Sequence, residues 1–155
     1  MEQTRKIIGI TLGDPAGVGP EITAKALADP ELYTRCKPIV IGDRAILERA
    51  CRLAGCPQLK VHPVTSPADG LYQPGVIDLY DMNLLRCEDY AIGQVSAKAG
   101  DAAFQYVRKV IELALDGQVD ATVTNPLNKE AMNLAGHHFS GHTEIYAHYT
   151  GTQHY

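Results

Sequence analysis

The sequence contains no tryptophan, few phenylalanines and no long uninterrupted hydrophobic run. No stretch approaches the ~20 apolar residues that a membrane-spanning helix needs. The hydrophobic segment near the N-terminus is interrupted by Gly9 and Gly13, too early for a secretion signal. We therefore expect neither membrane insertion nor export, and predict a cytoplasmic protein.

The sequence also lacks a basic excess and the common cysteine and serine motifs. Its 14 Lys and Arg residues against 18 Asp and Glu give a formal net charge of −4, which argues against a nucleic-acid-binding protein. No G-x-S-x-G nucleophile motif and no C-x-x-C pair occurs. We expect reduced thiols at the four cysteines, which are Cys36, Cys51, Cys56 and Cys87.

With 155 residues the chain has the length of one domain or of a piece of a larger one. Strand-like and helix-like segments alternate along it, which predicts an α/β fold with a mostly parallel sheet and flanking helices. The last six residues resemble a turn leading into further structure, so we expect the chain to end within a domain. The predicted strands are 6–12, 38–41, 59–64, 76–80 and 121–124, and the predicted helices are 20–28, 44–54, 96–115, 128–135 and 143–150. Asp43 and Ser96 are the predicted caps of helices 44–54 and 96–115. The apolar face of helix 44–54 is expected to contain Ile46, Leu47, Ala50 and Leu53.

The first candidate binding loop, residues 13–21, follows the first predicted strand. Asp14, Gly17 and Gly19 lie in it, and it leads into the N-terminus of a helix, where free N–H groups favour an anion. Its glycine spacing is neither the G-x-G-x-x-G fingerprint nor a P-loop. A tight strand–helix turn that binds nothing is the alternative.

The second candidate loop, residues 124–130, follows the strand at 121–124 and contains Asn125 and Lys129. Ligands of open α/β sheets bind beyond the carboxyl ends of the strands. A lysine in the first turn of a helix opposes the helix dipole, so local stability does not explain it, and an anionic ligand would. A solvated surface lysine is the alternative.

The third candidate site, His142 and Thr143, begins the last predicted helix and offers an imidazole, a hydroxyl and free amides to an anion. The neighbouring histidines suggest zinc, but their spacing does not supply an obvious third ligand, so we predict no metal site in this chain. His137 and His138 are expected to be exposed loop residues, and His62 a structural one.

Three motifs together resemble one family. Residues 10–21 (ITLGDPAGVGPE), 124–130 (TNPLNKE) and 134–144 (LAGHHFSGHTE) resemble, in this order, the PdxA family. Its members are 4-hydroxythreonine-4-phosphate dehydrogenases of vitamin B6 (pyridoxine and pyridoxal phosphate) biosynthesis and their 4-phospho-D-threonate dehydrogenase relatives. The first motif is also similar to the opening of isocitrate and isopropylmalate dehydrogenases, which implies a related fold.

The resemblance implies an oxidoreductase that uses NAD or NADP to oxidise the secondary alcohol of a phosphorylated hydroxy acid. The substrate expected first is 4-phosphooxy-threonine, and the alternative substrate is 4-phospho-D-threonate or a related phosphorylated sugar acid. The resemblance also implies a divalent metal (Zn, Mg or Co) that binds the substrate's oxygens. Family members are homodimers whose active site lies at the subunit interface, between two α/β subdomains.

The resemblance assigns substrate binding to His142 and Thr143, places Asn125 and Lys129 near the site, and leaves the catalytic residues unassigned. It implies that the metal histidines and most nicotinamide contacts lie beyond residue 155. We therefore expect residues 1–155 to be the N-terminal portion of a two-subdomain dehydrogenase that lacks its C-terminal half and is inactive alone. A non-catalytic domain that binds phosphometabolites is the alternative of another class.

Overall fold

The computed structural model describes residues 4–155. Five strands form one sheet in the order β3-β4-β2-β1-β5, and every neighbouring pair is parallel. The predicted α/β class with a parallel sheet is confirmed. The strands are β1 (Lys6–Thr11), β2 (Cys36–Gly42), β3 (Lys60–Val64), β4 (Val76–Asp81) and β5 (Ala121–Thr124).

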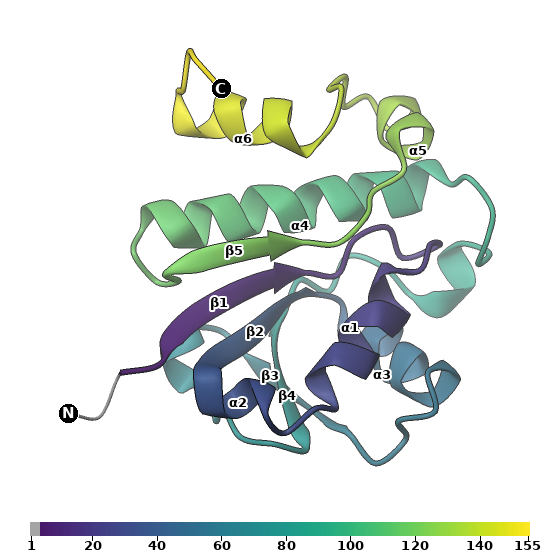
Figure 1. The fold of residues 1–155 in the computed structure, drawn as a ribbon. Helices are drawn as coiled ribbons and strands as arrows, with labels where there is room; N and C mark the ends of the chain where they lie inside the picture. The colour runs from purple at the N-terminus through teal and green to yellow at the C-terminus, as the bar shows by residue number, and fades with distance from the viewer. Residues whose placement is uncertain (1–3) are drawn as a thin grey trace.

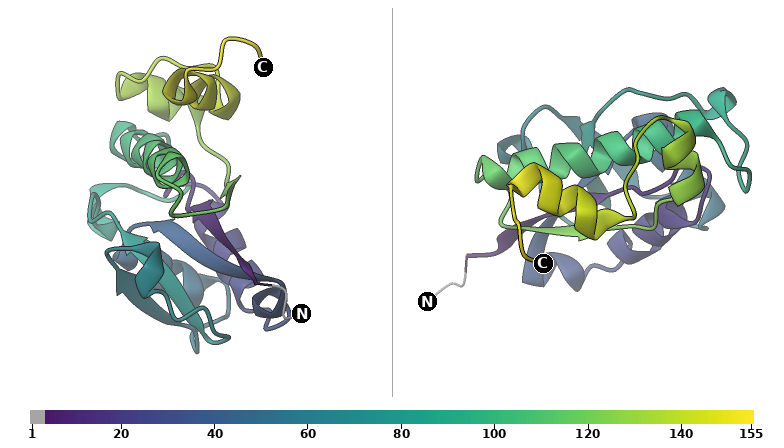
Figure 2. Two further views of the ribbon diagram at one scale, coloured as in Figure 1. Left: turned by 90° about the vertical axis from the view of Figure 1, so that its left-hand side faces the viewer. Right: turned by 90° about the horizontal axis from the view of Figure 1, so that it is seen from above.

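The helices flank the sheet on both faces (Figures 1 and 2). α1 and α3 lie on one face, while α4 lies along the other, with α5 at one end of α4 and α6 on the side of α4 away from the sheet. The helices are α1 (Gly19–Leu27), α2 (Leu32–Arg35), α3 (Arg44–Leu53), α4 (Ala97–Leu115), α5 (Lys129–Leu134) and α6 (His142–Thr150), with short 3₁₀ helices η1 (Pro67–Asp69) and η2 (Cys87–Asp89).

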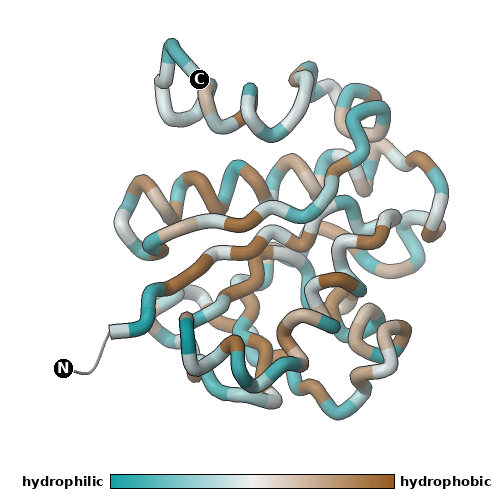
Figure 3. Tube along the Cα trace, in the orientation of Figure 1, coloured by the Kyte–Doolittle hydropathy of each residue, from teal (hydrophilic) through white to brown (hydrophobic). Residues whose placement is uncertain are grey.

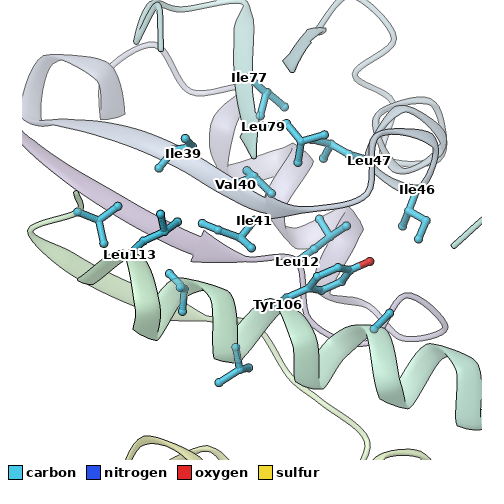
Figure 4. Close-up of a cluster of buried hydrophobic side chains, with 14 of the residues drawn as sticks. Leu12, Ile39, Val40, Ile41, Ile46, Leu47, Ile77, Leu79, Tyr106 and Leu113 are labelled. Carbon is cyan, nitrogen blue, oxygen red and sulfur yellow. The ribbon is translucent and has the colours of Figure 1, made fainter. Parts of the chain in front are cut away.

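The hydrophobic core occupies both faces of the central strand β2. Successive side chains of a strand point to opposite faces, so Ile39 and Ile41 pack toward α4 while Val40 packs toward Leu79 and α3 (Figure 4). All four side chains are fully buried. Hydrophobic residues are concentrated along the central strands and recur along α4, whereas α6 is mostly polar (Figure 3). A parallel strand covered on both faces explains this continuous apolar run.

Two glycines allow α4 to pack closely on its neighbours. A Cβ atom at Gly9 in β1 would lie 2.7 Å from Val110 of α4, and one at Gly100 in α4 would lie 2.2 Å from the backbone of Ala131 in α5. Ser96 caps α4 as predicted, because its hydroxyl accepts a hydrogen bond from the N–H of Ala99. Close packing therefore holds α5 against the N-terminal end of α4.

Some local predictions were wrong. The sequence did not indicate α2 or the two 3₁₀ helices, and β2 begins at Cys36, two residues before the predicted start. Leu53 was expected on the buried face of α3, yet it is 58% exposed, because it lies in the last turn of the helix beyond the sheet-facing residues. Asp43 occupies the N-cap position of α3, but its side chain makes no capping hydrogen bond and binds elsewhere.

Two general expectations can be compared with the structure. All four cysteines lie in the described part of the chain and are free thiols, as predicted. Within residues 4–155, no helix has the length and apolar character needed to cross a membrane.

Candidate functional site

The first two candidate loops touch each other at the carboxyl ends of β1 and β5. The N–H of Asp14 donates a hydrogen bond to the carbonyl oxygen of Pro126 at 2.9 Å. Gly13 adopts a φ of +77°, and a Cβ atom at this position would lie 2.7 Å from that same oxygen. The two loops meet because β1 and β5 are parallel neighbours, and a glycine is required where the loops cross.

Asn125 connects the two loops to α1. Its side-chain NH₂ donates to the carbonyl oxygen of Thr11 at 2.9 Å and to the hydroxyl of Thr23 at 2.7 Å. Its backbone N–H donates to the Thr11 hydroxyl at 3.2 Å. Asn125 is buried, and both of its side-chain N–H groups are used within the protein. This residue therefore holds the loop in place, and its predicted proximity to a ligand stays a prediction.

The glycines that precede and begin α1 differ in what they permit. A Cβ atom at Gly19 would lie 2.5 Å from the carbonyl oxygen of Leu12, so packing alone requires glycine there. A Cβ atom at Gly17 would have its nearest neighbour at 3.5 Å, in ordinary van der Waals contact. The side chain of Asp14 accepts a hydrogen bond from the N–H of Ala16 at 2.8 Å, and burial raises the pKa of this carboxyl group. Packing thus explains Gly19 but not Gly17.

The third candidate segment lies beside the second. The Cε atom of Lys129, in the first turn of α5, lies 3.6 Å from the position that a Cβ atom would take on Gly141. Gly141 directly precedes His142, the first residue of α6. The structure therefore brings all three sequence-predicted segments together at one edge of the sheet. Figure 1 shows this edge, where β5 leads into α5 and the chain then crosses to α6.

The imidazole of His142 carries a buried nitrogen that no other group within residues 4–155 satisfies. Among the described residues, its Nε2 is the single buried side-chain nitrogen or oxygen that has no hydrogen-bond partner. Burial lowers the pKa of His142 below its usual value, and the backbone of Asn125 partly offsets this effect. A buried polar atom without a partner costs free energy, which a bound ligand can recover. This atom therefore points to a ligand.

The His142 and Thr143 side chains line one cavity. Its volume is about 360 Å³, and Tyr146, Ala147 and Thr150 of α6 continue its wall. The Tyr146 hydroxyl donates to Thr122 of β5 at 2.8 Å, which fixes α6 against the edge strand. The cavity has room for a small metabolite beside the start of α6.

The described residues do not fit a metal ion. Within residues 4–155, no three His, Cys, Asp or Glu side chains come together as a set of ligands. The expectation that such ligands lie beyond residue 155 stays a prediction.

The histidine predictions were partly right. His138 is exposed, as expected. His62 is a structural residue, because its Nδ1 pairs with the buried carboxylate of Asp78 at 2.9 Å. The expectation for His137 was wrong, since its ring is half-buried and stacks on Phe104 of α4. No local pattern could have indicated this contact, which joins residues 33 positions apart in the sequence.

The fold is a parallel α/β unit whose loops after β1 and β5 meet the start of α6 beyond the carboxyl ends of the strands, which is where open sheets of this class bind small ligands. Residues 34–155 match the family described as pyridoxal phosphate biosynthetic protein PdxA. The chain belongs to this family.

Related proteins extend over nearly the whole chain. The D-threonate 4-phosphate dehydrogenase of Cupriavidus necator is 47% identical over 146 residues, which are 94% of this chain and 43% of the relative. A candidate D-threonate 4-phosphate dehydrogenase of Symbiobacterium thermophilum is 50% identical over 96% of this chain and 44% of its own length. The chain therefore spans less than half the length of these curated relatives.

Solved structures agree with this assignment. The crystal structure of a 4-hydroxythreonine-4-phosphate dehydrogenase from Burkholderia phymatum superposes with a TM-score of 0.93 at 45% identity, over 98% of this chain and 46% of that one. The corresponding enzyme of Klebsiella pneumoniae superposes with a TM-score of 0.90 at 40% identity, over 99% of this chain and 46% of that one. The fold described above is thus the fold of these dehydrogenases over the matched region.

Proposed function

We propose that the three loops bind the phosphate group of a small phosphorylated hydroxy acid. The observation that carries this proposal is the buried, unpartnered Nε2 of His142 at the start of α6. A phosphate oxygen would give this nitrogen its missing hydrogen bond. The free N–H groups of the first turn of α6 and the Thr143 hydroxyl supply further donors.

Lys129 completes a set of donors suited to a dianion. Its side chain passes Gly141, so its ammonium group lies close to the N-terminus of α6. An ammonium and a helix N-terminus both favour negative charge. Asp14 and Gly17 belong to the neighbouring loop, and we propose that they border the site rather than contact the phosphate.

For the longer protein we propose a dehydrogenase that oxidises the secondary alcohol of the phosphorylated substrate. Bound NAD or NADP would accept the hydride, and a divalent metal held outside residues 4–155 would bind the substrate's oxygens. In this scheme the described residues bind and orient the phosphate end of the substrate. We further propose a cytoplasmic homodimer, as in the family that the sequence resembles.

We propose D-threonate 4-phosphate as the substrate, since both of the curated relatives reported above carry that name. The substrate that the family resemblance placed first, 4-phosphooxy-threonine (also named 4-hydroxythreonine 4-phosphate), thereby becomes the second candidate. It stays a candidate because the two solved structures carry its name. The two substrates differ at one carbon, which bears a hydroxyl in the first and an amino group in the second.

Two measurements test the proposal separately. Isothermal titration of the 155-residue chain with inorganic phosphate should show binding that is lost in His142→Ala and retained in His138→Ala, which removes an exposed imidazole of the same segment. Absence of phosphate binding, or equal binding by both variants, would contradict the site.

The second measurement is formation of NADH or NADPH from either substrate with Mg²⁺, Zn²⁺ or Co²⁺ present. We expect turnover from the longer protein, faster with D-threonate 4-phosphate, and none from the 155-residue chain. Turnover by the short chain would contradict the assignment of the metal site to residues beyond 155. Phosphate binding with no turnover by the longer protein would favour the non-catalytic alternative.

A further inference from the structure

The ring of His137 is held by two independent contacts on α4. It stacks on the buried ring of Phe104 with a centroid separation of 3.8 Å and an interplanar angle of 13°. Its Nε2 lies 2.6 Å from a carboxylate oxygen of Asp101, one helical turn before Phe104. Stacking fixes the plane of the imidazole, and the hydrogen bond fixes its rotation within that plane.

The segment that carries His137 connects α5 to α6 and ends at the proposed phosphate site. Phe139, two residues further on, also stacks on Phe104, at 5.6 Å and 20°. The ring of His148 in α6 packs edge-on against Phe139 at 5.5 Å. Residues 137 and 139 therefore attach this segment to α4 on one side and to α6 on the other.

The two ends of the segment are glycines. Gly136 adopts a φ of +93° after the last turn of α5, and Gly141 is the N-cap of α6. Glycine restricts the backbone less than any other residue, so neither end holds the segment rigidly by itself. The orientation of the first turn of α6 depends on the contacts between these glycines.

We propose that His137 is a positioning residue for the phosphate site. By clamping residues 136–141 to Asp101 and Phe104, it sets the direction of the His142 imidazole and of the N–H groups at the start of α6. This inference rests on the proposed function, because it assigns His137 a role in phosphate binding through His142. A preorganised site binds more tightly, since less ordering remains to be done when the ligand arrives.

The clamp lies at the margin of the hydrophobic core, to which, of its three residues, only Phe104 belongs. The side chains of His137 and Asp101 are 22% and 48% exposed. At the far end of the segment, the N–H of Ser140 donates to the carboxylate of Glu144 at 2.5 Å, an interaction that also lowers the pKa of Glu144. Loss of the His137 contacts should therefore loosen this segment without unfolding the sheet.

The test uses three variants of the protein and two readouts. His137→Ala removes both contacts, and His137→Phe keeps an aromatic ring for stacking but loses the bond to Asp101. His138→Ala, the matched control, removes the adjacent exposed imidazole. The readouts are the dissociation constant for inorganic phosphate and the hydrogen-exchange rates of the backbone amides of residues 138–144.

For His137→Ala we expect phosphate affinity to fall about fivefold and exchange of these amides to accelerate, while amides of β1 and β2 remain unchanged. His137→Phe should lie between His137→Ala and the unmodified protein, and His138→Ala should match the unmodified protein in both readouts. Should His137→Ala unfold the whole chain, His137→Phe alone decides by the same two readouts.

The inference is overturned if the His137 variants exchange and bind phosphate as His138→Ala does. If the unmodified protein binds no phosphate, the proposed function fails. The exchange rates would still show whether His137 clamps the segment, so the two failures are distinguishable.

Discussion

Two buried polar groups at the same edge of the sheet differ in how well they are satisfied. Asp43 follows β2 and accepts hydrogen bonds from the N–H groups of Leu84 and Leu85, at 2.7 and 3.2 Å, and from the Tyr106 hydroxyl at 2.5 Å. His142 begins α6 and has a buried Nε2 with no partner. The first group is complete within the protein, whereas the second is not.

This difference distinguishes a residue with a structural role from a residue that can bind a ligand. Asp43 joins the β4–α4 loop and α4 to the end of β2, and its burial raises the pKa of its carboxyl group despite these hydrogen bonds. A satisfied buried group stabilises the fold and has little left to offer a ligand. A buried group with an unused donor or acceptor suits a ligand that supplies the partner. Changes at the two positions should therefore have opposite consequences.

The largest expected effect is on stability at Asp43. Asp43→Ala leaves the buried Tyr106 hydroxyl and the N–H groups of Leu84 and Leu85 without their acceptor, and should lower the free energy of unfolding by about 3 kcal/mol. Asp116→Ala, which removes an exposed carboxylate at the end of α4, should change it by less than about 0.5 kcal/mol. Urea denaturation measures both values. Equal losses of stability in the two variants would show that the hydrogen bonds of Asp43 do not stabilise the fold.

The glycines of the first loop provide the next test. Gly19→Ala places a Cβ atom 2.5 Å from the carbonyl oxygen of Leu12 and should cost about 2 kcal/mol of stability. Gly17→Ala meets nothing closer than 3.5 Å and should leave the free energy of unfolding within about 0.5 kcal/mol of its original value. Thermal or urea denaturation of the two variants checks the difference.

Gly17 also tests how far the first loop takes part in binding. If this loop only borders the site, Gly17→Ala should bind inorganic phosphate as the unmodified chain does. A clear loss of affinity in this stable variant would place the loop in contact with the phosphate, as one sequence-based alternative predicted.

Much of this arrangement could be predicted from local sequence patterns. Apolar runs bounded by glycine and proline indicated the five strands, and the cap at Ser96 marked the start of α4. The order of the elements also placed loops 13–21 and 124–130 beyond the carboxyl ends of strands, whereas the pairing of β1 with β5, which brings them together, is seen only in the structure. Local patterns alone could not establish roles that depend on distant partners.

Three residues illustrate that limit. The sequence predicts Asp43 as a helix cap, but its carboxylate accepts hydrogen bonds from the backbone N–H groups of Leu84 and Leu85, about forty positions away. Asn125 reads as a ligand-binding residue, but its amide is bonded to Thr11 and Thr23 across the sheet. His137 reads as an exposed loop residue and instead stacks on α4. In each case tertiary contacts determine the role.

The smallest expected effect concerns the pH dependence of stability. Burial lowers the pKa of His142 in the folded chain, so the unfolded chain takes up its proton at a higher pH. The stability that comes from a neutral His142 is present above the unfolded pKa of about 6.5 and is lost as the pH falls toward the folded value. His142→Gln should therefore lose less stability than the unmodified chain between pH 7.5 and pH 5, as measured by urea denaturation at both pH values.

Bound phosphate should raise the pKa of His142, which burial lowers in the free chain. A bound dianion favours the protonated imidazole, so saturating inorganic phosphate should raise the pKa of His142 as measured by NMR. His138 serves as the internal control, because its exposed imidazole lies outside the proposed site and its NMR signals should not respond to phosphate. An unchanged His142 pKa in saturating phosphate would argue against contact between the two.

The most direct measurement of the central claim is an NMR titration of the amide signals with inorganic phosphate. We predict saturable shifts that cluster at residues 125–129 and 141–144, with smaller ones at 14–19, and their loss in His142→Ala. Shifts confined to another basic region, such as that around Arg5 and Arg35, or the same shifts in His142→Ala, would contradict the assignment of the phosphate site to these three loops.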